Sequence, residues 1–208
     1  DKIDLASFHS PFPKMVQYAF ASFLIHDWRG LPKWKKILEA IGPEPSREGL
    51  TDVEFYISEE YKNFRRKFTR TEEFQTEYKN KIVNSLTALS QIGNSYTASV
   101  WLGVESHFET RTENLAGKRF GIGSYGSGSS AIVCSFIVQP EYKEVAKKMN
   151  LMEKLSQRKR IPLDVYEDLH EGRLKLHESV ISPKNEFTLV SLGNKSHDYG
   201  YRYYKYVK

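Results

Sequence analysis

Apolar residues in the first part of the chain recur at helical spacing in two stretches. The stretch over 15–24 predicts an amphipathic helix that begins at the prolines just before it, because proline suits a first helical turn. A second helix is predicted over Pro32–Ile41, where glycine and proline follow. Residues 44–70 are charged and have no clean period. We therefore expect an elaboration on a compact core over about 28–70.

The rest of the chain mixes helical periods with short β-rich runs. An apolar run over 4–8 predicts a buried strand that leads into His9. Further helices are predicted over 71–93, 95–109, 141–155 and 162–171, and further strands over 118–124, 131–138, 186–192 and 201–207. This mixture predicts one α/β domain over 1–208, with a mixed sheet packed between helices.

Composition narrows the class of protein. The chain has 208 residues, of which 39% are hydrophobic and 13% aromatic, and this excludes disorder over most of its length. No apolar run approaches the ~20 residues needed to cross a bilayer, and no signal peptide opens the chain, so we expect a cytoplasmic protein without a membrane partner. The net charge of +5 is mild and suits anionic ligands such as phosphates or coenzyme A.

Cysteine and histidine usage argues against a metal centre. A single cysteine excludes a disulfide scaffold and a multi-cysteine zinc site, and the histidines lack metal-ligand spacing. We therefore expect neither a metal nor a cofactor. Cys134 lies in a continuous apolar run, and we interpret it as a buried, inert packing residue rather than a nucleophile.

Two polar positions and one glycine-rich run are candidates for chemistry. His9 follows a predicted strand, where α/β sheets often present reactive groups. Asn94 is either a helix N-cap or an amide aimed at a substrate oxygen, and its own motif does not decide. The run over 121–126 matches the dinucleotide pattern G-x-G-x-x-G, but a strand follows it instead of a helix, so we reject a nucleotide site.

Three separated motifs taken together resemble one family. They are FHSPFPK over 8–14, GNSYTAS over 93–99 and LAGKRFGIGSYGSG over 115–128. In this order they resemble the C-terminal half of 3-hydroxy-3-methylglutaryl-CoA (HMG-CoA) synthase. The resemblance is clear over 3–155 and weaker towards the tyrosine-rich end. One departure is Gly123, where the family usually has phenylalanine, and we expect looser local packing there with an intact loop.

The resemblance implies a fold, a reaction and a partner. Family members have the thiolase fold, in which two similar α/β halves enclose the active site. They are acyltransferases that join acetyl-CoA to acetoacetyl-CoA and release HMG-CoA, which feeds isoprenoid synthesis through mevalonate. The N-terminal half carries a cysteine nucleophile and a glutamate base. We expect such a half to pack against this chain in a large interface, and the pair to form a symmetric oligomer.

The resemblance also implies site residues. His9 resembles the histidine that polarises the acetoacetyl ketone and protonates the alkoxide, which is general-acid work. Asn94 resembles the amide that orients acyl oxygens, and Ser127 resembles a donor to the thioester oxygen. Lys14 resembles a coenzyme A phosphate contact. Further expected substrate or coenzyme A contacts in these motifs are Pro11, Tyr96 and Gly126.

Two rival functions remain open. A 3-ketoacyl carrier-protein synthase of type III also pairs a histidine with an asparagine in a G-N-x-x-x-x-S context, although the SYGSG loop favours the HMG-CoA synthase reading. A non-catalytic nucleic-acid-binding module could use the tyrosines and basic residues over 201–206. Alternating tyrosines are more simply a half-exposed strand, so we expect no nucleic acid partner.

Overall fold

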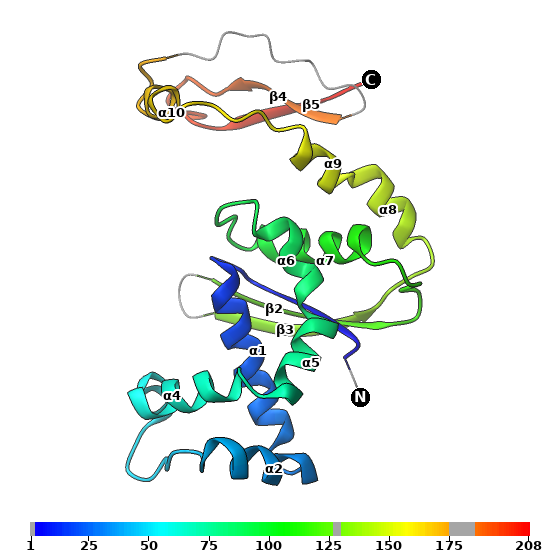
Figure 1. The fold of residues 1–208 in the computed structure, drawn as a ribbon. Helices are drawn as coiled ribbons and strands as arrows, with labels where there is room; N and C mark the ends of the chain where they lie inside the picture. Colours follow the sequence, from blue (N-terminus) through cyan, green and yellow to red (C-terminus); the bar gives the residue numbers. More distant parts are fainter. Residues whose placement is uncertain (1–2, 127–129, 175–185) are drawn as a thin grey trace. The chain divides into compact units, whose positions relative to one another are not determined.

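The computed structural model describes residues 3–126, 130–174 and 186–208 (Figure 1). Contacts divide the chain into two compact units, Asp1–Arg158 and Lys159–Lys208, which are described separately. The expectation of one domain over 1–208 stays a prediction. The elements of the first unit are β1 (Leu5–Phe8), α1 (Pro13–Trp28), α2 (Pro32–Ile41), α3 (Asp52–Ile57), α4 (Glu59–Phe68), α5 (Glu72–Lys81), α6 (Val83–Leu89), α7 (Ala98–Thr110), β2 (Arg119–Gly126), β3 (Ser130–Ile137), α8 (Tyr142–Met149) and α9 (Leu151–Ser156).

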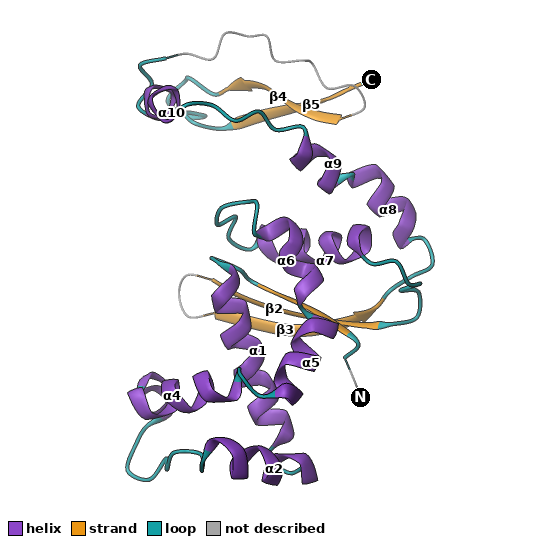
Figure 2. Ribbon diagram, viewed as in Figure 1, coloured by secondary structure: helices purple, strands orange, loops and turns teal. Residues whose placement is uncertain are grey.

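The first unit is built on a three-stranded mixed sheet in the order β1-β2-β3. Strand β1 runs parallel to β2, with Phe8 opposite Gly123, and β2 runs antiparallel to β3. Neighbouring residues of β1 belong to two different cores, because successive side chains of a strand point to opposite faces. Leu5 packs in a core with residues of α7, and Ala6 packs in a core with residues of α1. The sheet therefore lies between helices, as predicted (Figure 2).

The helix α7 approaches β1 closely enough to require a glycine. A Cβ atom on Gly103 would lie 2.1 Å from the Oγ of Ser7, so a larger residue would separate the two elements. The Ser7 hydroxyl donates a hydrogen bond of 2.9 Å to the carbonyl oxygen of Val100 on the same helix. This contact fixes α7 against the strand that ends next to His9.

The segment over 44–70 is more regular than its charge pattern predicts, because it forms α3 and α4. Thr51 caps α3 through a capping box, and the Ser58 side chain accepts from the N–H of Tyr61 at the start of α4. These short helices bury four aromatic residues: Phe55, Tyr61, Phe64 and Phe68. The break at Ser58 interrupts the apolar spacing, which is why the segment shows no single period.

Two predicted helices are each divided in the structure. The helix predicted over 71–93 becomes α5 and α6, with a break at Ile82, which is fully buried. The helix predicted over 141–155 becomes α8 and α9, and Asn150 between them has a left-handed backbone with φ of 48°. Asparagine adopts that conformation more readily than most residues. The helical spacing of apolar residues continues across both breaks, so the sequence pattern did not predict them.

The second unit contains α10 (Leu163–His170) and the antiparallel pair β4 (Glu186–Leu192) and β5 (Arg202–Val207). The strand pair predicted at the C-terminal end is therefore confirmed. On β5 the side chains of Tyr203, Tyr204 and Tyr206 are all exposed. Among the described residues, the helices are too short or too polar to cross a membrane.

Candidate active site

His9 lies directly after β1, at the point where the chain turns towards α1. Its backbone N–H donates a hydrogen bond of 2.8 Å to the Gly123 carbonyl, so the position of His9 continues the β1–β2 ladder. The residue is 7% exposed. Its Nδ1 atom is buried and has no hydrogen-bond partner among the described residues. The strand thus fixes the backbone of His9, while no hydrogen bond from the described residues holds Nδ1 of its ring.

The Asn94 loop leads into α7. The Asn94 Oδ1 atom accepts a hydrogen bond of 2.9 Å from the backbone N–H of Tyr96, which has a positive φ of 52°. Helix α7 begins at Ala98, and its N-cap residue is Thr97. The N-cap interpretation of Asn94 is therefore wrong, because the chain makes a further turn before the helix starts. Asn94 and Tyr96 are both exposed, as expected for side chains that meet a substrate.

Two serine-mediated bonds hold this loop against the His9 segment. The Ser99 hydroxyl donates to the carbonyl oxygen of Tyr96 at 2.6 Å. The Ser99 hydroxyl oxygen in turn accepts a hydrogen bond of 2.9 Å from the backbone N–H of Ser10. The motifs that contain His9 and Asn94 are therefore brought together, although they lie far apart in the sequence.

The glycine-rich hairpin completes the cluster from β2. The ring of Tyr125 stacks on the His9 imidazole, with ring centroids 4.3 Å apart and an angle of 29° between the planes. Gly126 follows and is exposed. The predicted site residue Ser127 lies outside the described residues. Residues 121–126 are part of β2, and a strand follows them, so the rejection of a nucleotide-binding loop is confirmed.

The remaining predicted contacts lie at the start of α1. Lys14 is exposed on the first turn, and its Nζ donates a hydrogen bond of 2.7 Å to the side-chain oxygen of Gln17. The same ammonium lies 5.1 Å from the centre of the Tyr18 ring. Pro11 is half-buried in the turn between His9 and the helix. Lys14 is thus free to exchange a local partner for an anionic ligand.

Unpaired buried polar atoms gather where the first two motifs meet. Besides His9 Nδ1, the hydroxyl oxygens of Ser10 and Ser95 are buried without a hydrogen-bond partner among the described residues. Buried polar atoms in folded proteins are nearly always paired, so such a concentration marks a place where a ligand, water or partner chain supplies the missing bonds.

Gly123 faces an occupied space. A Cβ atom at this position would lie 2.7 Å from Cδ1 of Phe8, the residue opposite it across the two strands. The Phe8 ring therefore takes up room beside Gly123, at the position where the family usually has phenylalanine. The expected looser packing at this point is not what the contacts indicate.

His107 on α7 is a buried titratable group whose pKa is strongly shifted. Burial lowers the pKa of His107 to about 4. Its Nδ1 accepts from the Arg111 guanidinium at 3.3 Å, and its Nε2 lies 3.2 Å from the Ala6 carbonyl oxygen. Because Nδ1 accepts, a neutral ring donates from Nε2 and ties α7 to β1. The neutral His107 ring therefore serves the packing of α7 on β1.

A pair of carboxyl groups, Glu105 and Glu109, lies on the same helix, one before and one after His107. Burial, followed by the hydrogen bond and the charge of Glu109, raises the pKa of Glu105 to about 7. Glu109 in turn accepts from the backbone N–H groups of Leu151 and Met152 at the start of α9, at 2.5 and 2.8 Å. A protonated Glu105 beside an ionised Glu109 satisfies this arrangement. The pattern of apolar residues did not single out either glutamate.

The interpretation of Cys134 as a buried residue is wrong, because the thiol is exposed. Strand β3 is an edge strand, and its residues are exposed along almost its whole length, including Ile132 and Val133. The helices pack mainly on β1 and β2. A continuous apolar run indicates that a strand is covered, but it does not say whether the cover belongs to the same chain.

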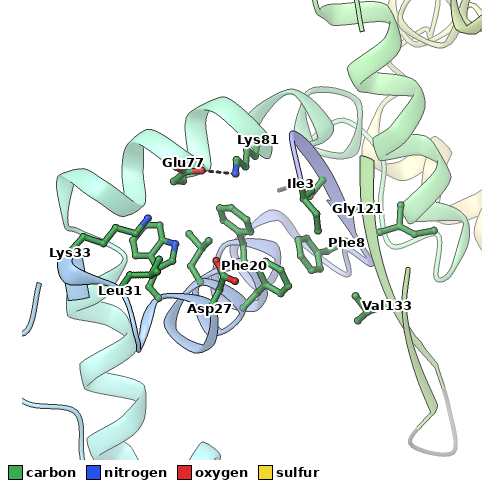
Figure 3. Close-up of a pocket in the computed structure, with 15 residues that line it drawn as sticks. Ile3, Phe8, Phe20, Asp27, Leu31, Lys33, Glu77, Lys81, Gly121 and Val133 are labelled. Atoms are coloured by element: carbon green, nitrogen blue, oxygen red, sulfur yellow. Dashed lines mark ion pairs between the residues drawn. The ribbon is translucent and has the colours of Figure 1, made fainter. Parts of the chain in front are cut away.

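A cavity of about 490 Å³ lies on the side of the sheet that faces α1 and α5 (Figure 3). Phe8, Phe20 and Gly121 line it, and the ion pair between Glu77 and Lys81 lies at its edge. None of the described candidate site residues lines it. The described residues also contain no cluster of three or more His, Cys, Asp or Glu that could hold a metal ion.

Comparisons with known proteins agree on one family. A family model described as the C-terminal part of hydroxymethylglutaryl-coenzyme A synthase matches residues 1–194. The chain is 30% identical over 198 residues to hydroxymethylglutaryl-CoA synthase of Schizosaccharomyces pombe, covering 93% of this chain and 42% of that protein. It is 27% identical over 215 residues to the synthase of Haloferax volcanii, covering 100% of this chain and 47% of that protein.

A solved structure agrees with the fold. The structure titled "MvaS in complex with 3-hydroxy-3-methylglutaryl coenzyme A" matches with a TM-score of 0.62 at 24% identity, over 99% of this chain and 42% of that one. The α/β fold is therefore that of the C-terminal half of a thiolase-like synthase. The chain spans less than half the length of the curated relatives described above.

Proposed function

Because the chain belongs to the family of hydroxymethylglutaryl-CoA synthase C-terminal domains, we propose that it forms the C-terminal half of an active HMG-CoA synthase. The observation that carries this proposal is the convergence of the three motifs. Ser10 N–H bonds to Ser99, and Tyr125 stacks on His9, so the histidine, the amide loop and the glycine-rich hairpin share one site.

The proposed reaction needs groups from two halves. A cysteine of the N-terminal half holds the acetyl group as a thioester, and a glutamate there removes a proton from the acetyl methyl group. The resulting carbon attacks C3 of acetoacetyl-CoA, a carbon–carbon bond forms, and the ketone oxygen becomes an alkoxide. Water then hydrolyses the thioester to the cysteine and releases HMG-CoA.

Residues of this chain would act on the acetoacetyl group. His9 donates a proton to the developing alkoxide as a general acid, and its buried position makes that interaction stronger than it is in water. Asn94 orients the acyl oxygens, while Ser127 donates to the thioester oxygen. Lys14 meets a coenzyme A phosphate, and an exposed ammonium on a helix beside the site suits that role. Pro11, Tyr96 and Gly126 line the substrate.

Strand β3 of this chain offers an exposed apolar surface on which the proposed N-terminal half could pack. Ile132, Val133 and Ile137 of β3 are exposed together with Cys134, and an apolar strand edge of this kind is typical of an interface. The unpaired Nδ1 of His9 also supports a neighbour that supplies a polar group. We further propose that the pair forms a symmetric oligomer and serves the mevalonate pathway in the cytoplasm without a cofactor.

The experiment is a product assay on the two-half enzyme. Labelled acetyl-CoA is supplied with either acetoacetyl-CoA or a malonyl carrier protein, and the products are identified by mass. Labelled HMG-CoA supports the proposal, whereas a 3-ketoacyl carrier protein would assign the chain to the rival condensing enzymes. Residues 1–208 are also incubated alone. Acetylation of Cys134 followed by turnover would overturn the need for a second half.

A further inference from the structure

We propose that Tyr125 is the positioning residue for His9, holding the plane of the imidazole so that its free edge faces the ketone oxygen. The inference rests on the proposed function and deepens it. None of the three motif roles given above assigns a task to this tyrosine.

The ring contact is close and flat. The centroids of Tyr125 and His9 are 4.3 Å apart, with an angle of 29° between the planes, so the two rings are stacked. His9 is 7% exposed, whereas Tyr125 is 44% exposed. The tyrosine therefore lies on the outer side and covers one face of the histidine. Rotation of the imidazole about its last side-chain torsion would break this contact.

His9 lacks, among the described residues, the hydrogen bond on Nδ1 that usually orients the ring of a catalytic histidine. In most sites one ring nitrogen is hydrogen-bonded to the protein, and this bond fixes the direction of the other nitrogen. Here Nδ1 is buried and has no partner among the described residues. Stacking on Tyr125 is the side-chain contact that the described residues provide in its place.

The two rings are held in register by the sheet. The His9 N–H donates to the Gly123 carbonyl at 2.8 Å, which ties the backbone of His9 to β2 two residues before Tyr125. Tyr125 itself pairs with Ala131 across the β2–β3 hairpin. The tyrosine is therefore placed by strand pairing rather than by the glycine-rich tip, and the imidazole is aligned before substrate enters.

Such alignment acts on the chemical step more than on binding. A misplacement of about 1 Å of a reacting group costs up to about 10²-fold in rate, because the geometry for proton transfer is lost. The aromatic ring, rather than its hydroxyl group, provides the stack. A phenylalanine at position 125 should therefore keep the stacking on His9, whereas a leucine should lose it.

The test compares Tyr125→Phe and Tyr125→Leu in the complete two-half enzyme, with Tyr166→Leu as a matched control. Tyr166 stacks on His170 of the same helix, α10, with centroids 5.9 Å apart, so the control removes another tyrosine from another histidine, neither of them a proposed site residue. We expect Tyr125→Leu to lower kcat by about 10- to 10²-fold with KM for acetoacetyl-CoA little changed. Tyr125→Phe and the control should stay close to the parent.

A spectroscopic readout separates this inference from the proposed function. In histidine-labelled enzyme, the ring protons of His9 should lie upfield because of the tyrosine ring, and they should move downfield in Tyr125→Leu but not in Tyr125→Phe. His9→Gln identifies the signal. Unchanged kcat in Tyr125→Leu, or equal losses in both variants, would overturn the inference. An unchanged His9 signal would overturn it too, even if the parent enzyme makes a product other than HMG-CoA.

Discussion

The backbone N–H of Ser10 donates a hydrogen bond of 2.9 Å to the Ser99 hydroxyl oxygen, joining two segments that lie 89 positions apart. This bond places the residue after His9 against the first turn of α7. Both serines are buried, so the N–H has no access to water as a substitute partner. The Ser99 hydroxyl group therefore contributes to the relative position of the His9 and Asn94 motifs, together with the Ser7–Val100 bond.

Ser99→Ala should destabilise the protein by about 1–3 kcal/mol, because it leaves a buried N–H without an acceptor. Thermal unfolding measures the effect. Ser90→Ala is the control, since the exposed Ser90 hydroxyl donates only to the Thr87 carbonyl within one turn. The control should change stability by less than about 0.5 kcal/mol. Equal losses in the two variants would mean that the Ser10–Ser99 bond contributes nothing of its own.

His9→Ala should reduce condensation in the two-half enzyme by about 10²–10⁴-fold, the usual scale of general acid–base catalysis. Coenzyme A binding should stay nearly intact, because the imidazole acts on the ketone. Steady-state rates and equilibrium binding of acetoacetyl-CoA measure the two effects. Condensation within about threefold of the parent would contradict the role of His9.

Lys14→Ala should raise KM for coenzyme A thioesters more than it lowers kcat, because the ammonium contacts a part of the substrate that does not react. The loss should shrink at high salt, since Lys14 is exposed and its charge is screened. Lys36→Ala removes an exposed lysine of α2 as a control. A fall in kcat with KM unchanged would show that Lys14 has another task.

Glu105 should make the protein less stable as the pH rises. Its pKa is raised by burial to about 7, so the folded state binds the proton more tightly than the unfolded state does. The free energy of unfolding should therefore fall between about pH 4.5 and pH 7, by at most about 3 kcal/mol. Glu105→Gln carries no titrating proton, and its stability should lack this fall. Identical pH profiles for the parent and the variant would contradict the raised pKa of Glu105.

Gly123→Ala should destabilise the protein by about 1–3 kcal/mol, because the new Cβ atom meets the Phe8 ring at 2.7 Å. Shortening the ring in Phe8→Leu should recover part of this loss when the two changes are combined. Melting temperatures of the single and double variants give the coupling energy. Purely additive losses would show that Phe8 does not occupy the space in front of Gly123.

The sequence by itself determined most of the elements and the family. Apolar spacing and prolines predicted α1 and α2 close to their bounds, and β-rich runs predicted β2 and β3. These features are local, since they follow from helix period, first-turn proline and strand propensity. The three motifs, read in order, were enough to indicate the synthase family that the comparisons identify.

The tertiary structure decided what depends on distant neighbours. Helices α5 and α6 separate at the buried Ile82, although the apolar period runs through the break. Cys134 is exposed, and the sequence did not reveal this because an apolar strand does not show which chain covers it. The stack of Tyr125 on His9 follows from the register of β1 on β2, two strands more than 100 residues apart. Burial and ring contacts of this kind depend on packing between distant segments, and local sequence patterns do not predict that packing.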